Sequence, residues 1–238
     1  MPDAARAELA PAGRLRAALN YSNTLLISTR GADLTGVAPD LARELAARAG
    51  ATVELIGYAN AGLAADAVAA SSWDVAFIGA EPQRAGAITF SPAYVEIEAT
   101  YLVPPGSSLR QIEDVDRDGV HIATAARAAY TLFLQRTLRH AALVEADGLP
   151  AAFDRFVEMK LDALAGLKPN LLENAASLAG TRVLDGRFTA VQQSIGVPKS
   201  RAAAARYLQS FVTEITTSGL LRDLITRHRV DGLSIVRG

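Results

Sequence analysis

The chain has 238 residues, of which 50% are hydrophobic and 21% charged, a composition typical of a globular protein and not of a disordered one. This length allows one large domain or two small ones. The formal net charge of -1 gives no broad attraction to nucleic acid or to an anionic membrane. The chain has no cysteine and only three scattered histidines, so we expect no disulfide, no metal site and no cofactor.

Short apolar runs alternate with amphipathic stretches, which is typical of strands interleaved with helices. The clearest helix spans 36–50: Pro39 suits its first turn, Leu41 and Leu45 lie on its apolar stripe, and Gly50 ends it. The first series of elements is predicted as strand 15–20, helix 36–50, strand 52–58, helix 63–71 and strand 73–79.

A second series of the same kind follows Pro104, Pro105 and Gly106. It is predicted as strand 120–124, helix 128–138, strand 142–146, helix 149–159, strand 161–165 and helix 169–178. The extended segments 89–103 and 188–197 join the two series, and the helices 200–218 and 220–228 return to the first. The sequence therefore predicts an α/β protein of two units joined by two extended crossings.

The stretch from Trp73 to Tyr94 contains Arg84 followed by the run Phe90, Ser91, Pro92. It resembles a signature of the extracellular solute-binding protein family 3, the amino-acid-type substrate-binding proteins of ABC transporters. The order of the predicted strands and helices also fits, so the resemblance extends from Leu15 to about Val230. It is specific for the fold and less so for the ligand, because the same fold also hosts enzymes, sensors and regulatory domains.

The resemblance implies the two-lobed periplasmic binding protein type 2 fold, in which two α/β domains hold a ligand in an interlobe cleft and close by hinge motion. Lobe 1 would comprise residues 1–95 and 194–238, and lobe 2 residues 96–193. The hinges would lie near 95–100 and 190–194. In open α/β sheets ligands bind beyond the carboxyl ends of the strands, so we expect each lobe to supply one such edge.

The resemblance assigns ligand contacts of opposite charge to Arg84 and Asp162. Arg84 matches the arginine that grips the ligand α-carboxylate, and a guanidinium fork suits bidentate binding of a carboxylate. Asp162 falls where the family places the acid that receives the ligand α-ammonium. The structural alternatives are a surface arginine for Arg84 and a helix cap or an ion pair for Asp162.

Further candidates lie around the ends of the first lobe's strands. Asn20 and Asn23 follow the first strand, where the family contacts the ligand side chain with an acidic or amide residue and an aromatic one; turn formation is the alternative. Gly79 ends the third strand. Gln192 lies on the returning crossing, where it would contact the ligand or stabilise the closed form; the structural alternative is an inter-strand hydrogen bond. Tyr21 is a candidate for the aromatic position that Asn23 does not fill.

Three candidates depart from the family pattern. Glu81 stands where the family usually has a threonine, and it is expected to orient Arg84, to accept a second ammonium, or to be a solvated charge at the start of a helix. Thr124 and Arg127 lie where a glycine and a hydroxyl residue are common. Thr124 would then supply the hydroxyl and Arg127 a second cation. These changes argue against a plain α-amino acid and leave room for an acidic or otherwise modified ligand.

The function implied by the resemblance is non-catalytic capture of a small zwitterionic or anionic, amino-acid-like solute, for transport by an ABC permease or for sensing. The alternative is a cyclohexadienyl-dehydratase-like lyase, with Glu81 as general acid beside a carboxylate held by Arg84. The family implies a periplasmic location. Met1–Leu19 lacks the apolar run of a signal peptide or a membrane span, so a cytoplasmic solute-binding protein is the alternative, and we expect no membrane insertion.

Overall fold

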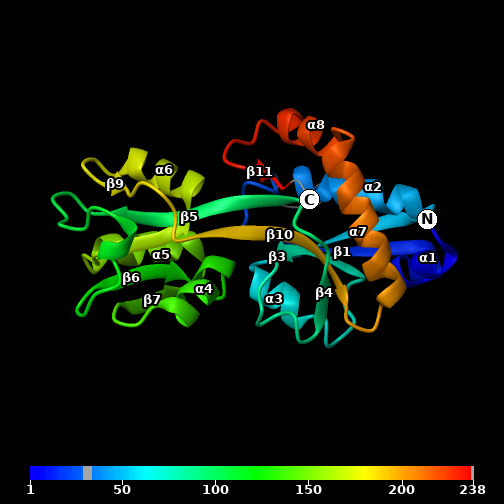
Figure 1. Ribbon diagram of the computed structural model, residues 1–238, viewed down its shortest axis with the longest axis horizontal. Coiled ribbons are helices and arrows are strands. Elements are labelled where there is room, and N and C mark those ends of the chain that lie inside the picture. Colours follow the sequence, from blue (N-terminus) through cyan, green and yellow to red (C-terminus); the bar gives the residue numbers. More distant parts are fainter. Residues whose placement is uncertain (29–33, 237–238) are drawn as a thin grey trace. The chain divides into compact units, whose positions relative to one another are not determined.

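The computed structural model describes residues 1–28 and 34–236 (Figure 1). The chain forms two compact units: unit 1 comprises Met1–Glu96 and Gln192–Gly238, and unit 2 comprises Ile97–Val191. Both boundaries lie on long strands, β5 (Val95–Val103) and β10 (Thr189–Pro198), which therefore carry the chain from one unit into the other and back.

Unit 1 consists of a mixed parallel and antiparallel sheet covered by helices. Its strands and helices are α1 (Asp3–Leu9), β1 (Arg14–Asn20), α2 (Val37–Ala49), β2 (Thr52–Tyr58), α3 (Ala61–Asp66), β3 (Val75–Gly79), β4 (Ile88–Phe90), α7 (Ala202–Thr217), α8 (Leu220–Arg227) and β11 (Ser234–Ile235). A short 3-10 turn, Pro11–Gly13, links α1 to β1. The main core gathers apolar residues from β1, β3, α2 and α7, including Leu41, Leu45 and Phe211.

The register of unit 1 places the ends of its strands at one edge. β1 pairs in parallel with β2 and β3, so the carboxyl ends of these strands meet there. β10 runs antiparallel to β3 and pairs Gln193 with Gly79, which brings the first half of β10 to the same edge. β4 pairs with β10, and β11 pairs with β5 at Val95 and Glu96.

An ion network centred on Asp74, the residue before β3, joins several elements of unit 1. The fully buried carboxylate of Asp74 accepts hydrogen bonds from the side chain of Arg16 on β1 and from Arg201 at the start of α7. Arg201 also donates to the Glu8 carbonyl, and the Glu8 carboxylate accepts the backbone N–H of Ala204. These bonds tie α1 and α7, which lie side by side in Figure 1, to the sheet.

Unit 2 repeats the α/β architecture around a smaller sheet. Its elements besides β5 are β6 (His121–Ala125), α4 (Ala129–Thr137), β7 (Ala142–Ala146), α5 (Gly148–Glu158), β8 (Ala163–Leu167), α6 (Lys168–Ser177) and β9 (Arg182–Val183), with a 3-10 turn at Ile112–Asp114. The strand order is β5-β8-β6-β7. β6 runs parallel to β7 and β8, whereas β5 runs antiparallel to β8.

The structure differs from the expected elements at three places that bear on the site. β8 begins at Ala163 and ends at Leu167, two residues later than predicted. The helix expected from 63 to 71 ends at Asp66, and turns follow up to Ser71, which has a φ of 52°. Residues 82–87 form turns that lead directly into β4, so no helix follows Glu81. A helix that the sequence did not indicate, α1, packs in unit 1.

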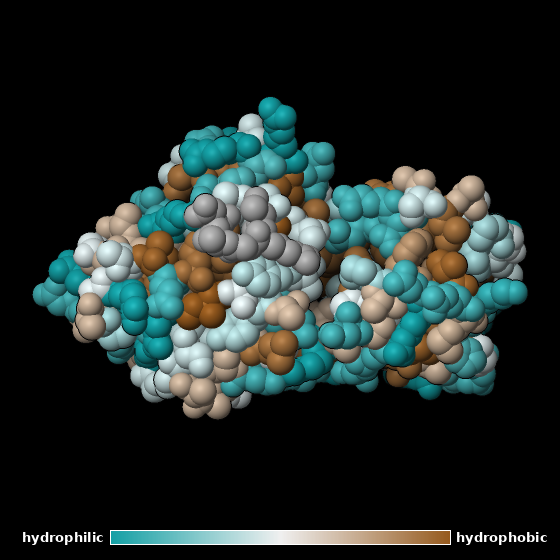
Figure 2. All heavy atoms as spheres, turned by 180° about the vertical axis from the view of Figure 1, so that it is seen from behind, coloured by the Kyte–Doolittle hydropathy of each residue, from teal (hydrophilic) through white to brown (hydrophobic). Residues whose placement is uncertain are grey.

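Neither a membrane-spanning helix nor a metal-binding group of side chains is found among the described residues. No helix in residues 1–28 and 34–236 is both long and apolar enough to cross a membrane. The same part of the chain holds no group of three acidic or histidine side chains that could bind a metal ion. On the face in Figure 2, hydrophobic residues occur in small groups among hydrophilic ones, as on most protein surfaces.

Candidate functional site

Arg84 is held at the carboxyl end of β3. The residue is only 6% exposed, and Nη1 donates a hydrogen bond of 2.6 Å to the Gly79 carbonyl. The backbone N–H of Arg84 donates to the Glu81 carbonyl at 2.9 Å, which closes the turn between the two residues. The guanidinium is thus fixed at the sheet edge where ligands of open α/β sheets bind.

Glu81 is half-buried in the same turn as Arg84. Because residues 82–87 form turns, Glu81 is not the first-turn charge of a helix, which corrects one of its expected roles. Its position three residues before Arg84 keeps both charged groups at the end of β3.

Asn20 and Asn23 belong to the turn after β1 and have different environments. Asn20 Oδ1 accepts the N–H and the hydroxyl of Ser22 at 3.1 and 2.7 Å, so this side chain forms a turn. Asn23 is 5% exposed, and within the described part of the chain its Oδ1 has no hydrogen-bond partner. A buried acceptor without a donor is costly, so Asn23 is the stronger candidate for a polar ligand contact.

Tyr21 packs over a glycine of the neighbouring strand. A Cβ placed on Gly57 of β2 would lie 1.8 Å from Tyr21 Cζ, so the ring covers Gly57. Glycine inside a strand is the sequence signal of such a close approach. The Tyr21 ring therefore packs on β2.

Gln192 links the two long strands at the boundary of unit 1. Its Nε2 donates to Glu96 Oε2 at 2.8 Å, and its carbonyl accepts the N–H of Ala80 at 2.8 Å. The second bond places Gln192 next to Gly79. The structure therefore brings Gly79, Glu81, Arg84 and Gln192 together at one edge, and it adds Glu96, which the sequence did not indicate.

Thr124 lies inside unit 2 and not on its surface. It is fully buried, and its hydroxyl lies 2.6 Å from that of Thr131 on α4, which in turn donates to the Ala125 carbonyl. The expectation that Thr124 offers a hydroxyl to a ligand is corrected: its hydroxyl joins β6 to α4.

Arg127 is exposed in the loop between β6 and α4, at the carboxyl end of β6. Its φ of 61° lies in the left-handed region, which favours glycine. A non-glycine residue there costs about 1–2 kcal/mol. Such strain is common at functional positions, so Arg127 stays a candidate on the expected edge.

Asp162 lies at the amino end of β8 and not at the carboxyl ends of the strands, where a ligand contact was expected. This corrects its predicted place in the site. It precedes β8, and its carboxylate accepts the N–H of His121, the first residue of β6, at 2.8 Å. The five residues of β8 separate this edge from the carboxyl edge by about 17 Å at 3.3 Å per residue. Asp162 therefore does not share an edge with Arg127, and it has the structural role of satisfying a strand terminus.

The sequence did not indicate the charged residues that lie at the carboxyl end of β8. Lys168 Nζ lies 3.0 Å from Glu98 Oε2 on β5, and Arg187 Nη1 lies 3.8 Å from the other oxygen of Glu98. In the sequence, Lys168 stands just before the predicted helix 169–178, and no local motif connects it to Glu98. Only the strand register brings the two together.

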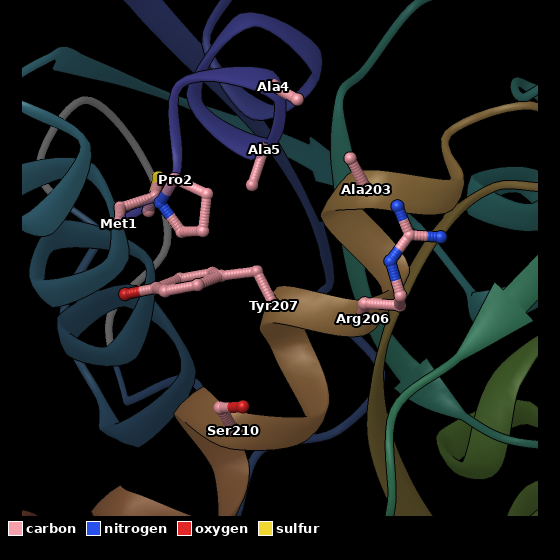
Figure 3. Close-up of a pocket in the computed structure, with 8 residues that line it drawn as sticks. All are labelled: Met1, Pro2, Ala4, Ala5, Ala203, Arg206, Tyr207 and Ser210. Atoms are coloured by element: carbon pink, nitrogen blue, oxygen red, sulfur yellow. The ribbon is translucent and has the colours of Figure 1, made fainter.

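A separate hollow of about 450 Å³ lies between α1 and α7 in unit 1 (Figure 3). It is lined by Met1, Pro2, Ala4, Ala5, Ala203, Arg206, Tyr207 and Ser210. Figure 3 shows the Tyr207 ring extending from α7 toward Pro2. None of the predicted site residues lines this hollow, so it is distinct from the edge that carries Arg84.

The comparison with protein families gives a match over most of the chain. The bacterial extracellular solute-binding proteins, family 3, match residues 20–230. No curated protein sequence matches the chain.

Solved structures share the fold at low sequence identity. A mutant of ArgBP from T. maritima has a TM-score of 0.77 at 20% identity, covering 94% of this chain and 99% of that one. An amino acid ABC transporter substrate-binding protein from Streptococcus pneumoniae bound to L-arginine has a TM-score of 0.75 at 17% identity, covering 98% of this chain and 99% of that one. An ancestral amino acid-binding protein, a precursor of cyclohexadienyl dehydratase, has a TM-score of 0.74 at 21% identity, covering 91% of this chain and 96% of that one. The fold is thus that of type 2 periplasmic binding proteins.

Proposed function

The chain belongs to the bacterial extracellular solute-binding proteins, family 3, and from this premise we propose that it captures a small zwitterionic or anionic, amino-acid-like solute. It delivers this solute to the permease of an ABC importer or reports its presence to a sensor. Since the family is extracellular by description, the proposed place of action is outside the cytoplasm.

Arg84 is the observation that carries this proposal. A buried guanidinium held by the Gly79 carbonyl is oriented before any solute arrives, so little side-chain entropy is lost on binding. Its planar fork donates two parallel hydrogen bonds to a carboxylate. The Asn23 Oδ1 at the end of the neighbouring strand then accepts a polar hydrogen of the same solute, which removes the cost of leaving it unpaired.

Binding without catalysis is the reading that we favour, and the lyase is its alternative. The observation that favours the lyase is that Glu81 and Arg84 share a turn, so that Glu81 would be a general acid beside a carboxylate bound by Arg84. One structural relative is also a precursor of cyclohexadienyl dehydratase. We expect no turnover of prephenate or arogenate, and measurable turnover that Glu81→Gln abolishes would establish the enzyme instead.

The binding proposal is tested with a thermal-shift panel of the amino acids and small carboxylates, followed by calorimetry with the compound that raises Tm most. Arg84→Lys keeps the charge but not the fork, and we expect it to weaken binding by roughly 2–5 kcal/mol. Arg222→Lys, at an exposed position on α8, is the matched control and should leave the affinity unchanged. Unchanged affinity in Arg84→Lys would remove Arg84 from the site.

A further inference from the structure

The hollow between α1 and α7 stays open because both helices present small side chains to it. Ala4 and Ala5 on α1 line it, and so does Ala203 on α7 (Figure 3). Ala5 is 1% exposed and therefore lies at the floor of the hollow. Packed helices normally interdigitate larger side chains, which leaves few voids between them. The alanines thus preserve a space of about 450 Å³ within unit 1.

The aromatic ring of Tyr207 forms a fixed wall of this hollow. It stacks on the ring of Phe211, one turn further along α7, with 6.4 Å between the two centroids and 29° between the planes. Phe211 is 1% exposed, and the Arg48 guanidinium lies 4.9 Å from the centroid of its ring. The Tyr207 ring is therefore held by its neighbours before a ligand arrives, and it offers a planar apolar surface.

The charge that faces the hollow is positive. Among the described residues, the lining side chains include one cation, Arg206, and no acid. Arg206 is exposed, and in residues 1–28 and 34–236 its guanidinium has no ion-pair or hydrogen-bond partner. The acid at the end of α1, Glu8, does not line the hollow, and its carboxylate accepts the N–H of Ala204. An anion can therefore pair with Arg206 without displacing another residue.

A hydroxyl group completes the polar side of the hollow. Ser210 lies one turn after Arg206 on α7, is exposed, and lines the same space. Ala203, Arg206, Tyr207 and Ser210 follow the spacing i, i+3, i+4, i+7, so they share one face of α7. A cation, a ring and a hydroxyl thus converge on a floor of alanines.

We propose that this hollow binds a small organic anion with a planar apolar body, of the class of the aromatic carboxylates. Its carboxylate pairs with Arg206, and its body packs against Tyr207 and the alanines. The volume falls within the range of about 300–1,000 Å³ usual for small-molecule sites, which are mostly apolar with a few polar groups. The site is separate from that of the proposed solute, because Arg84 and its neighbours do not line it.

The charge is tested with phenylacetate as the probe and with phenylacetamide, which has nearly the same shape and no charge. We expect phenylacetate to raise Tm, and calorimetry to show phenylacetamide binding about tenfold more weakly. Arg206→Gln should weaken the binding of phenylacetate by about the same factor. Arg222→Gln, at an exposed position on α8, is the matched control and should have no effect.

The hollow itself is tested by filling it. We expect Ala203→Phe to abolish the binding of phenylacetate, because the new ring takes the place of the ligand body. Ala202→Phe, at the exposed neighbouring position that does not line the hollow, should leave binding intact. Melting curves without ligand show whether each variant is folded. If Ala203→Phe does not fold, Arg206→Gln decides, because Arg206 is exposed.

The outcomes separate this inference from the proposed function. Phenylacetate binding that Arg84→Lys abolishes and Ala203→Phe preserves would place the probe at Arg84, which overturns the inference and leaves the proposed function in place. Absence of phenylacetate binding, or equal binding of phenylacetamide, would also overturn it. Phenylacetate binding that persists in Arg84→Lys and is lost in Ala203→Phe would support the inference, whatever the solute panel shows for Arg84.

Discussion

At the scale of single residues, Asp74 is a buried charge that holds several elements of unit 1 together. It is fully buried and receives hydrogen bonds from Arg16 and Arg201. Burial by itself would raise the pKa of Asp74, but the hydrogen bonds from Arg16 and Arg201 outweigh it and hold the pKa below its ordinary value. The ionised form is therefore the one that stabilises the fold.

Removal of this charge should destabilise the protein in a pH-dependent way. We expect Asp74→Asn to lower the free energy of unfolding by about 3–5 kcal/mol at neutral pH, because two arginines lose their buried partner. A lowered native pKa contributes stability above the ordinary pKa near 4 and loses it as the pH falls further. Urea unfolding at pH 7 and pH 3 should thus show a smaller difference at pH 3, with the exposed Asp3→Asn as control.

Gly36, which precedes α2, should tolerate no side chain. Its φ of 132° and the 2.4 Å between an added Cβ and the Leu26 carbonyl oxygen both oppose substitution. We expect Gly36→Ala to cost roughly 2–4 kcal/mol in unfolding free energy. Gly106→Ala, with a φ of 73° and open space around the Cβ, should cost only about 1 kcal/mol. Equal costs in thermal melts would show that strain at Gly36 is relieved by rearrangement.

At the scale of elements, α1 exists because of its tertiary contacts. A helix of seven residues is too short to be stable by itself in water. Ala5 and Leu9 are buried in unit 1, and Glu8 bonds to α7 through Ala204 and Arg201. The local pattern is too short to indicate this helix, and only the core and α7 decide it.

Truncation of the buried leucine tests that dependence. We expect Leu9→Ala to lower the free energy of unfolding by about 2–5 kcal/mol, because Leu9 is fully buried. Leu63→Ala on α3 removes an exposed leucine and should cost far less. A small effect of Leu9→Ala in denaturant titrations would mean that α1 is dispensable for the stability of unit 1.

The position of β8 has the largest consequence for the candidate site. A start at Ala163 instead of 161 leaves Asp162 outside the strand and puts Lys168 at its carboxyl end. Apolar residues run through both alternatives, so their pattern does not fix the boundary. The pairing of β8 with β5 and β6 decides it, because these pairs satisfy the backbone groups from Ala163 onward.

At the scale of the whole molecule, two strands connect the units, β5 and β10. The unit 1 end of β5 is held by the hydrogen bond between Gln192 and Glu96 and by pairing with β11. We expect the units to move as rigid bodies and to close when the solute binds, as hinge-closing proteins do. Small-angle scattering should therefore give a smaller radius of gyration with saturating solute. No change with a solute proven by calorimetry would contradict ligand-driven closure.

The α/β alternation, the two series of elements and the family signature around Arg84 could be predicted from the sequence, because each depends on periodicity or on neighbouring residues. Three relations could not be predicted and became visible in the fold: Thr124 is buried against Thr131, Asp162 and Arg127 lie at opposite ends of the strands of unit 2, and Lys168 pairs with Glu98. These relations join residues on different elements. Their physical basis is strand register, which depends on pairing between segments distant in the chain.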